Sequence, residues 1–175
     1  MPDLRDVVED DRGLIKKIQL SIPGYRGYRK REDLRIADSL LREEVAKRMT
    51  HVEKDAIEIR KLLGEAMEMD RMNDLKGLIY DIQTFRNRIE HAEQEYSGIS
   101  ADYRILENEL EALYEYDLKL FSSVDRIRNE LKGVDPTLDD ASFKVKVKEV
   151  RAVMKDLMED YDLRTETIAN MVVRK

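Results

Sequence analysis

Core-type residues follow an unbroken 3,4 spacing from residue 75 to residue 131, and this spacing constrains the fold more than any other feature. Asp117 is the one departure from the apolar pattern in the series. The positions are Leu75, Leu78, Ile82, Phe85, Ile89, Ala92, Tyr96, Ile99, Tyr103, Leu106, Leu110, Leu113, Asp117, Leu120, Val124, Ile127 and Leu131. Such a heptad seam places one apolar stripe along a helix, and partner helices have to cover that stripe.

Two further segments carry seams of the same kind and supply those partners. One runs from Leu34 to Ala66, and the other from Phe143 to Met171. We therefore predict an all-α single domain over 1–175, with long helices over 30–72, 74–132 and 139–174. Short connections between them favour antiparallel neighbours, which gives an elongated, coiled-coil-like bundle of three long helices. A short amphipathic helix over 3–20 precedes them, within an N-terminal part formed by residues 1–29.

Helix ends are predicted from capping residues and helix breakers. Asn73 or Asp74 is suited to cap the second long helix. Gly133 and Pro136 indicate a stop after residue 132, and the aspartates at 139 and 140 are candidates to cap the last helix.

Ser97 and Gly98 lie in the middle of the long seam and leave one alternative open. Gly costs about 1 kcal/mol in a helix interior, and Ser100 is a possible N-cap, so a break over 97–100 is feasible. A break has no need to preserve the heptad phase, yet the phase is preserved. We therefore expect one continuous helix over 74–132, and the alternative is a four-helix bundle with a break at 97–100.

Composition excludes several classes of protein. The chain has no Cys, which excludes disulfides, thiolate catalysis and Cys-ligated metal centres. Charged residues make up 40% of the sequence, and no apolar run approaches the roughly 20 residues that span a bilayer. The first residues are acidic, unlike the basic start of a signal peptide. We expect a soluble, cytoplasmic protein without a membrane span.

The strongest candidate for binding is the segment 23–32, here called the Tyr/Arg loop. Basic residues without any acid extend from Arg12 to Arg31, although the whole chain carries a net charge of −6. Tyrosines between guanidinium groups can stack on aromatic groups while the cations hold carboxylate or phosphate. The alternative is that both tyrosines pin the loop onto the bundle. The predicted partner-binding residues are Tyr25, Arg26, Tyr28, Arg29, Lys30 and Arg31.

The same segment resembles an uncharacterised prokaryotic helical family. Residues 23–28 read Pro-Gly-Tyr-Arg-Gly-Tyr, and a charged helical segment follows as far as Arg42. Members of that family carry a Pro-Gly-Tyr-x-Gly-Tyr loop followed by a charged helix. The resemblance covers about 20 residues and implies no known activity, so it supplies no catalytic residue.

The two histidines raise the possibility of a metal site. If a helical hairpin turns near Asn73, His51 lies level with Glu95. In the same register, Asp55 lies level with His91. Two imidazoles and two carboxylates can bind a divalent transition metal, but solvated His–carboxylate pairs on the flank of the seam are the preferred interpretation. We therefore predict no metal ligand and no cofactor.

Two charged residues at seam positions, Asp117 and Arg164, are interpreted as polar residues that set the helix register or that reach water through a local rotation. The sequence has no nucleotide loop, nucleophile elbow or zinc-protease motif. We predict a non-enzymatic helical scaffold or protein-interaction module, with homo-oligomers as one form of association. The alternatives are nucleic-acid binding through the same loop and a divalent-metal-binding helical protein.

Overall fold

The computed structural model describes residues 4–25, 31–92 and 106–173. This part of the chain is all-α and contains no strand. Its helices are α1 (Leu4–Ser21), α2 (Arg31–Glu65), α3 (Met69–His91), α4 (Glu107–Leu131) and α5 (Asp140–Val173). None of them is both long enough and apolar enough to cross a bilayer.

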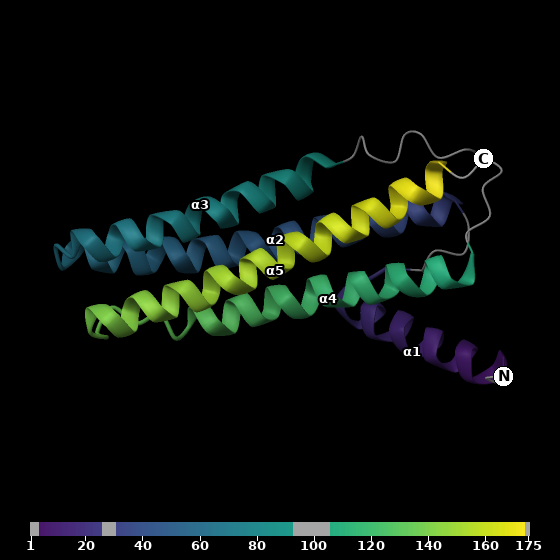
Figure 1. Ribbon diagram of the computed structural model, residues 1–175, viewed down its shortest axis with the longest axis horizontal. Coiled ribbons are helices and arrows are strands. Elements are labelled where there is room, and N and C mark those ends of the chain that lie inside the picture. Colours follow the sequence, from purple (N-terminus) through teal and green to yellow (C-terminus); the bar gives the residue numbers. More distant parts are fainter. Residues whose placement is uncertain (1–3, 26–30, 93–105, 174–175) are drawn as a thin grey trace.

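The four long helices form two antiparallel hairpins that pack side by side (Figure 1). One hairpin is α2 with α3, the other is α4 with α5, and α2 lies beside α4 while α3 lies beside α5. Ion pairs give the direction of α2 relative to α4: Arg48 Nη1 lies 3.2 Å from Asp125 Oδ1. Further along both helices, Asp55 Oδ2 lies 3.8 Å from Arg128 Nε. Because the residue numbers on α2 and on α4 rise together from the first ion pair to the second, the two helices are parallel neighbours.

The prediction of a continuous helix over 74–132 is wrong. α3 ends at His91, and α4 begins at Glu107 and runs back in the opposite direction (Figure 1). The 3,4 spacing predicts which side of each helix is buried, and both helices bury that side in one core. The heptad phase of the seam can therefore be preserved across two separate helices. The four-helix alternative has the correct number of long helices, but its break at 97–100 lies outside the described residues.

The turn between α2 and α3 lies at 66–68, not at Asn73 as predicted. The Glu68 N–H donates to the Leu63 carbonyl at 2.9 Å, and the Met67 N–H donates to the Gly64 carbonyl at 3.1 Å. These two bonds form a Schellman motif, in which Met67 adopts a left-handed φ of 58° that is usual for Gly. The sequence contains neither Gly nor Pro at 66–68, so the turn carries no sequence signal. Asn73 consequently lies inside α3.

The stop after residue 132 and the start of α5 agree with the sequence. α4 ends at Leu131, and Asp139 caps α5 by accepting hydrogen bonds from the Ser142 backbone N–H at 2.9 Å and hydroxyl at 2.7 Å. These bonds lower the pKa of Asp139 because they favour its ionised form, and the bond from the Ser142 backbone N–H has the largest effect.

The apolar seams line one continuous core, as their spacing predicts. Buried seam residues include Leu75, Leu78, Ile82, Phe85 and Ile89 from α3, and Leu113, Leu120, Val124, Ile127 and Leu131 from α4. α5 adds Phe143, Val147, Val150, Met154, Leu157, Tyr161 and Ile168. α1 packs against α4, and its end adds Ile18 to the same core.

Candidate functional site

Tyr25, the first predicted partner-binding residue, lies inside the bundle. Gly24 adopts a φ of 88°, which turns the chain after α1, and the Gln19 side-chain amide donates to the Tyr25 carbonyl at 3.0 Å. The Tyr25 side chain is 2% exposed, and its hydroxyl donates to Asp117 Oδ2 at 3.1 Å. In this position Tyr25 holds the start of the Tyr/Arg loop against the bundle. The pinning alternative includes Tyr28 as well, and Tyr28 lies outside the described residues.

Asp117 belongs to a buried polar cluster at the centre of the four long helices. Arg164 Nε on α5 donates to Asp117 Oδ1 on α4 at 2.7 Å. Its Nη1 donates to Asp38 Oδ1 on α2 at 2.8 Å. Arg42 Nε donates to Asp38 Oδ2 at 2.7 Å, one helical turn along α2. Among the described residues of this cluster, two arginines balance two aspartates.

The cluster also reaches α3. Arg42 Nη1 donates to the carbonyl of Ile89 at 3.4 Å, so each of the four long helices contributes to the network. Asp117 and Arg164 are 0% and 1% exposed. They therefore do not reach water through a local helix rotation, and their mutual pairing satisfies both charges in the core.

The chemistry of this cluster is that of structural ion pairs. Guanidinium groups stay protonated at all physiological pH values and act poorly as acids or bases. Sequence reasoning identified Asp117 and Arg164 as unusual, but it missed that they pair and that Asp38 and Arg42 complete the network. A possible signal was the i,i+4 spacing of Asp38 and Arg42 on a seam-flanking turn.

The remaining residues of the Tyr/Arg loop are not placed by the structure. Arg26, Tyr28, Arg29 and Lys30 lie outside the described residues. Arg31 begins α2, and its side chain is likewise outside the description. Their predicted role in binding a partner thus stays a prediction.

The structure tests the metal-site alternative only in part, because Glu95 lies outside the described residues. With the turn at 66–68, His51 lies level with the middle of α3. Asp55 faces α4 instead and pairs with Arg128. Within the described ranges, no three His, Asp or Glu side chains are grouped so that they could hold a metal ion.

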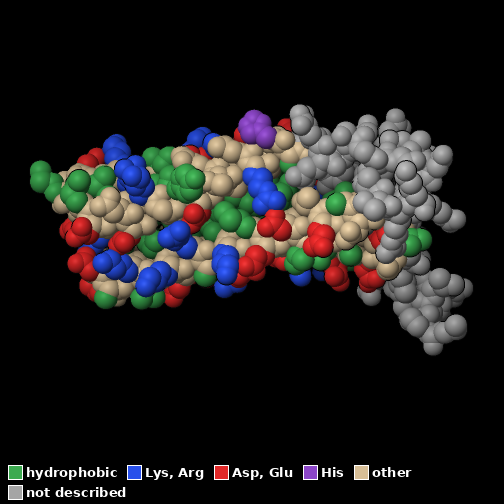
Figure 2. All heavy atoms as spheres, turned by 45° about the horizontal axis from the view of Figure 1, so that its top comes forward, with side chains coloured by type: hydrophobic (Ala, Val, Ile, Leu, Met, Phe, Trp, Pro, Cys, Tyr) green, Lys and Arg blue, Asp and Glu red, His purple; other side chains and the backbone are tan. Residues whose placement is uncertain are grey.

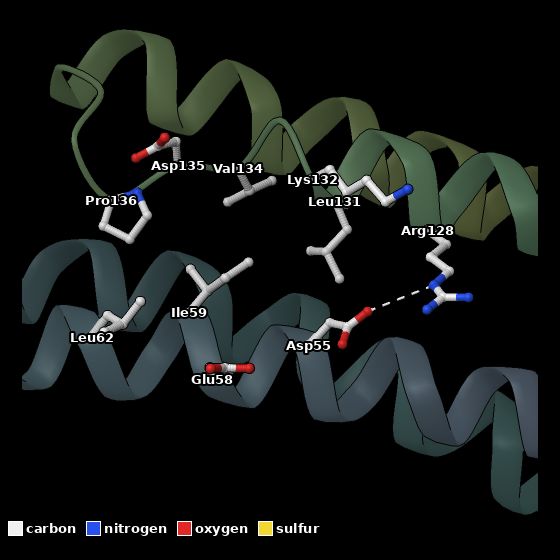
Figure 3. A pocket seen from close by; sticks show the side chains of 10 residues that line it. All are labelled: Asp55, Glu58, Ile59, Leu62, Arg128, Leu131, Lys132, Val134, Asp135 and Pro136. Carbon is white, nitrogen blue, oxygen red and sulfur yellow. Dashed lines mark ion pairs between the residues drawn. The ribbon is translucent and has the colours of Figure 1, made fainter.

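A groove of about 430 Å³ opens between α2 and the end of α4 (Figure 3). Ile59 and Leu62 face Leu131 and Pro136 across it, and the Asp55–Arg128 ion pair closes one end. The other lining residues are Glu58, Lys132, Val134 and Asp135. The groove has apolar side chains at its bottom and charges of both signs at its edge, so it can contact a partner. Its lining residues do not include a nucleophile next to a base, as an active site requires.

No protein-family model matches the chain, and no curated protein and no solved structure is found to match it either.

Proposed function

We propose that this protein is a non-enzymatic helical scaffold that binds an acidic partner protein through the Tyr/Arg loop. The observation that carries the proposal is the burial of Tyr25, which holds the beginning of the loop in the core through its hydrogen bond to Asp117. Four basic residues follow directly, at positions 26, 29, 30 and 31. We infer that the cations provide the contact with the partner and that Tyr25 fixes where the contact is made.

The proposal gains support from the two fixed ends of this basic segment. Tyr25 is buried at one end, and α2 begins with Arg31 at the other. Only residues 26–30, which lie outside the described residues, separate these two points. A segment whose ends are fixed loses less conformational entropy when it binds than a free tail does.

The inference that the scaffold is non-enzymatic is supported by how buried charges are used. The buried charged residues of the described chain are Asp38, Arg42, Glu53, Glu109, Asp117 and Arg164. Each of them accepts or donates a hydrogen bond within the chain. Groups that are already paired in the fold favour structural roles over acid–base chemistry.

The preference for a protein partner over a nucleic acid is based on charge. The chain as a whole carries −6, and the basic residues of the Tyr/Arg loop are a minority within it. A phosphate backbone that extends beyond the loop meets this negative charge, whereas a compact acidic surface on a protein does not have to.

The test compares affinity capture from native lysate by the wild type and by an Arg26→Ala/Arg29→Ala/Lys30→Ala variant. Tyr25 stays unchanged, because its removal would disturb the core. A Lys54→Ala/Lys61→Ala/Lys144→Ala variant, with three exposed lysines replaced elsewhere, is the control of equal charge. We expect an acidic protein that the wild type and the control capture and that the loop variant loses.

A captured set that does not differ between the three proteins contradicts the proposal. So does retention of a nucleic acid by the wild type and the control alone, since that outcome favours the nucleic-acid alternative. Binding to a labelled single-stranded RNA, measured at two salt concentrations, separates this case, because phosphate contacts weaken steeply with salt.

A further inference from the structure

A second groove lies between the parallel helices α3 and α5 and has a basic edge. It measures about 460 Å³ and is lined by Met154 and Met158 from α5, with Lys148 and Lys155 of the same helix beside them. Met154 is almost completely buried, so it forms the bottom of the groove. Methionine side chains adapt to the shape of an apolar partner and are common at docking surfaces.

The charge of this groove is opposite to the charge of the molecule. Its ionisable lining consists of Lys148, Arg151 and Lys155 with a single carboxylate, that of Asp81. Arg151 Nε contacts this carboxylate at 2.8 Å, and Lys155 Nζ lies 3.6 Å from Glu159, which is not part of the lining. The lining itself therefore has two more positive than negative charges, on a chain of net charge −6. Figure 2 shows Lys and Arg side chains interspersed with Asp and Glu side chains over this face of the molecule, so the excess of positive charge is local to the groove lining. The groove is therefore suited to an acidic segment with apolar side chains.

The chain itself contains such a segment in the first half of α1. Residues 4–11 read Leu-Arg-Asp-Val-Val-Glu-Asp-Asp, with four acids and one base. α1 contacts α4 within its own bundle, and towards its N-terminus the helix extends away from the bundle (Figure 1). Counted back from the buried Ile18 in steps of three and four residues, the apolar stripe of α1 passes through Asp11 and then Val7 or Val8. An acid within this stripe suits a groove edged by lysines better than it suits an apolar core.

We propose that the acidic first half of α1 from a second copy of this chain docks in the α3–α5 groove. The segment brings two valines to a groove that contains two methionines, and four acids to a groove edged by the lysines at 148 and 155.

The same chain's α1 does not serve as the occupant. Its other end is held on α4 by Ile18, and the next segment is held by Tyr25. α4 lies beside α5 but is not part of the groove. The contact therefore joins two different surfaces on two copies, which makes it a heterologous contact.

Sedimentation velocity of the full chain over a range of concentrations tests the proposal, with two charge-reversal variants. The groove variant is Lys148→Glu/Lys155→Glu, and the helix variant is Asp10→Lys/Asp11→Lys. We expect the wild type to associate as concentration rises, more strongly at low salt than at high salt. Each variant alone is expected to lose at least about tenfold in its association constant, because like charges then face each other.

The deciding measurement is an equimolar mixture of the two variants. The reversed groove of one then faces the reversed helix of the other, and the unchanged surfaces also remain complementary, so association is expected to return. Lys54→Glu/Lys61→Glu, with two exposed lysines of α2 reversed, is the control and is expected to behave like the wild type. Circular dichroism melting curves verify that every variant is folded.

Three outcomes overturn the proposal. The first is a wild type that remains monomeric up to about 1 mM, which leaves the groove to a different acidic partner. The second is a groove variant that associates as the wild type does. The third is a mixture of the two variants that stays monomeric, since the contact then does not depend on the pairing of these two surfaces.

Discussion

Pairs of arginine and aspartate join helices at two depths in this bundle, and the pairs have nearly the same geometry. In the core, Arg164 Nε lies 2.7 Å from Asp117 Oδ1, and both side chains are at most 1% exposed. On the surface, Arg151 Nε lies 2.8 Å from Asp81 Oδ2, with side chains that are 49% and 25% exposed. The distance is therefore a poor guide to energy, and burial decides what the loss of one partner costs.

The difference in depth corresponds to a difference in role. A buried carboxylate whose guanidinium is removed has no water to replace it, so the loss of one partner from the core cluster is strongly destabilising. The surface pairs align α3 with α5 along their length: Arg71 with Asp140, then Asp81 with Arg151, then Arg88 with Asp162. Water and salt screen these pairs, so each contributes little by itself.

The largest expected effect comes from Arg164→Met. This change leaves Asp117 and Asp38 as buried carboxylates without the guanidinium that joins them. We expect the free energy of unfolding to fall by about 3–5 kcal/mol, measured by urea denaturation. Arg128→Met, which removes an exposed partner of Asp55, is the matched control and is expected to cost less than about 1 kcal/mol.

A second variant identifies the cause of that loss. If unpaired charge is responsible, Arg164→Met combined with Asp117→Asn regains part of the stability, because one buried charge is then gone. Equal losses for Arg164→Met and for the Arg128 control contradict the distinction between the two depths. A double variant less stable than Arg164→Met indicates that packing, not charge, dominates at this position.

Tyr25→Phe is expected to have the next largest effect, because it removes one neutral donor from the same buried cluster. The hydroxyl bond to Asp117 is lost while the ring stays in the core. Hydrogen bonds to charged groups contribute about 2 kcal/mol, and we expect a loss of that size in urea denaturation. Tyr80→Phe, at a 68% exposed side chain, is the control. If the two changes cost the same, the ring and not the hydroxyl holds the Tyr/Arg loop.

The sequence was sufficient for the helices and the core but not for their arrangement. Apolar spacing identified buried positions such as Leu78, Ile127 and Leu157, because periodicity reports which face of a helix is covered. It does not report which helix covers that face. The same stripe therefore fitted one rod over 74–132 and two helices of opposite direction equally well.

The candidate site was predictable only in part for the same reason. Asp117 and Arg164 stood out as charges at seam positions, but their contact joins residues 47 positions apart on different helices. The turn at Met67 shows a second limit, since a left-handed residue that is not Gly leaves no trace in composition. Tyr25 fitted both an exposed and a pinned loop, and only its surroundings distinguish the two.

The pair of Asp81 and Arg151 tests the expectation that ion pairs on the surface contribute little to stability. A double-mutant cycle with Asp81→Ala and Arg151→Ala isolates the coupling energy of the pair. We expect a coupling below about 1 kcal/mol that decreases further in high salt, because both partners are in contact with water. A coupling that stays above this range at high salt would mean that the α3–α5 surface excludes water almost as the core does.

The smallest expected effect concerns Asp139, an exposed carboxylate that is hydrogen-bonded to the backbone and titrates with pH. The Ser142 N–H lowers its pKa in the folded state, so the contribution of the cap is complete above the pKa of an unfolded aspartate, about 3.9. It is lost as the pH falls through the lower folded pKa.

Asp139→Asn keeps an acceptor oxygen but has no charge to lose, so we expect a slightly lower melting temperature at neutral pH and a weaker decline below about pH 4. Asp156→Asn, at an exposed position in the interior of α5, is the control, and it is expected to follow the wild-type curve. Acid melting curves of Asp139→Asn that coincide with those of the wild type would show that this cap, like the surface pairs, adds too little to be measured.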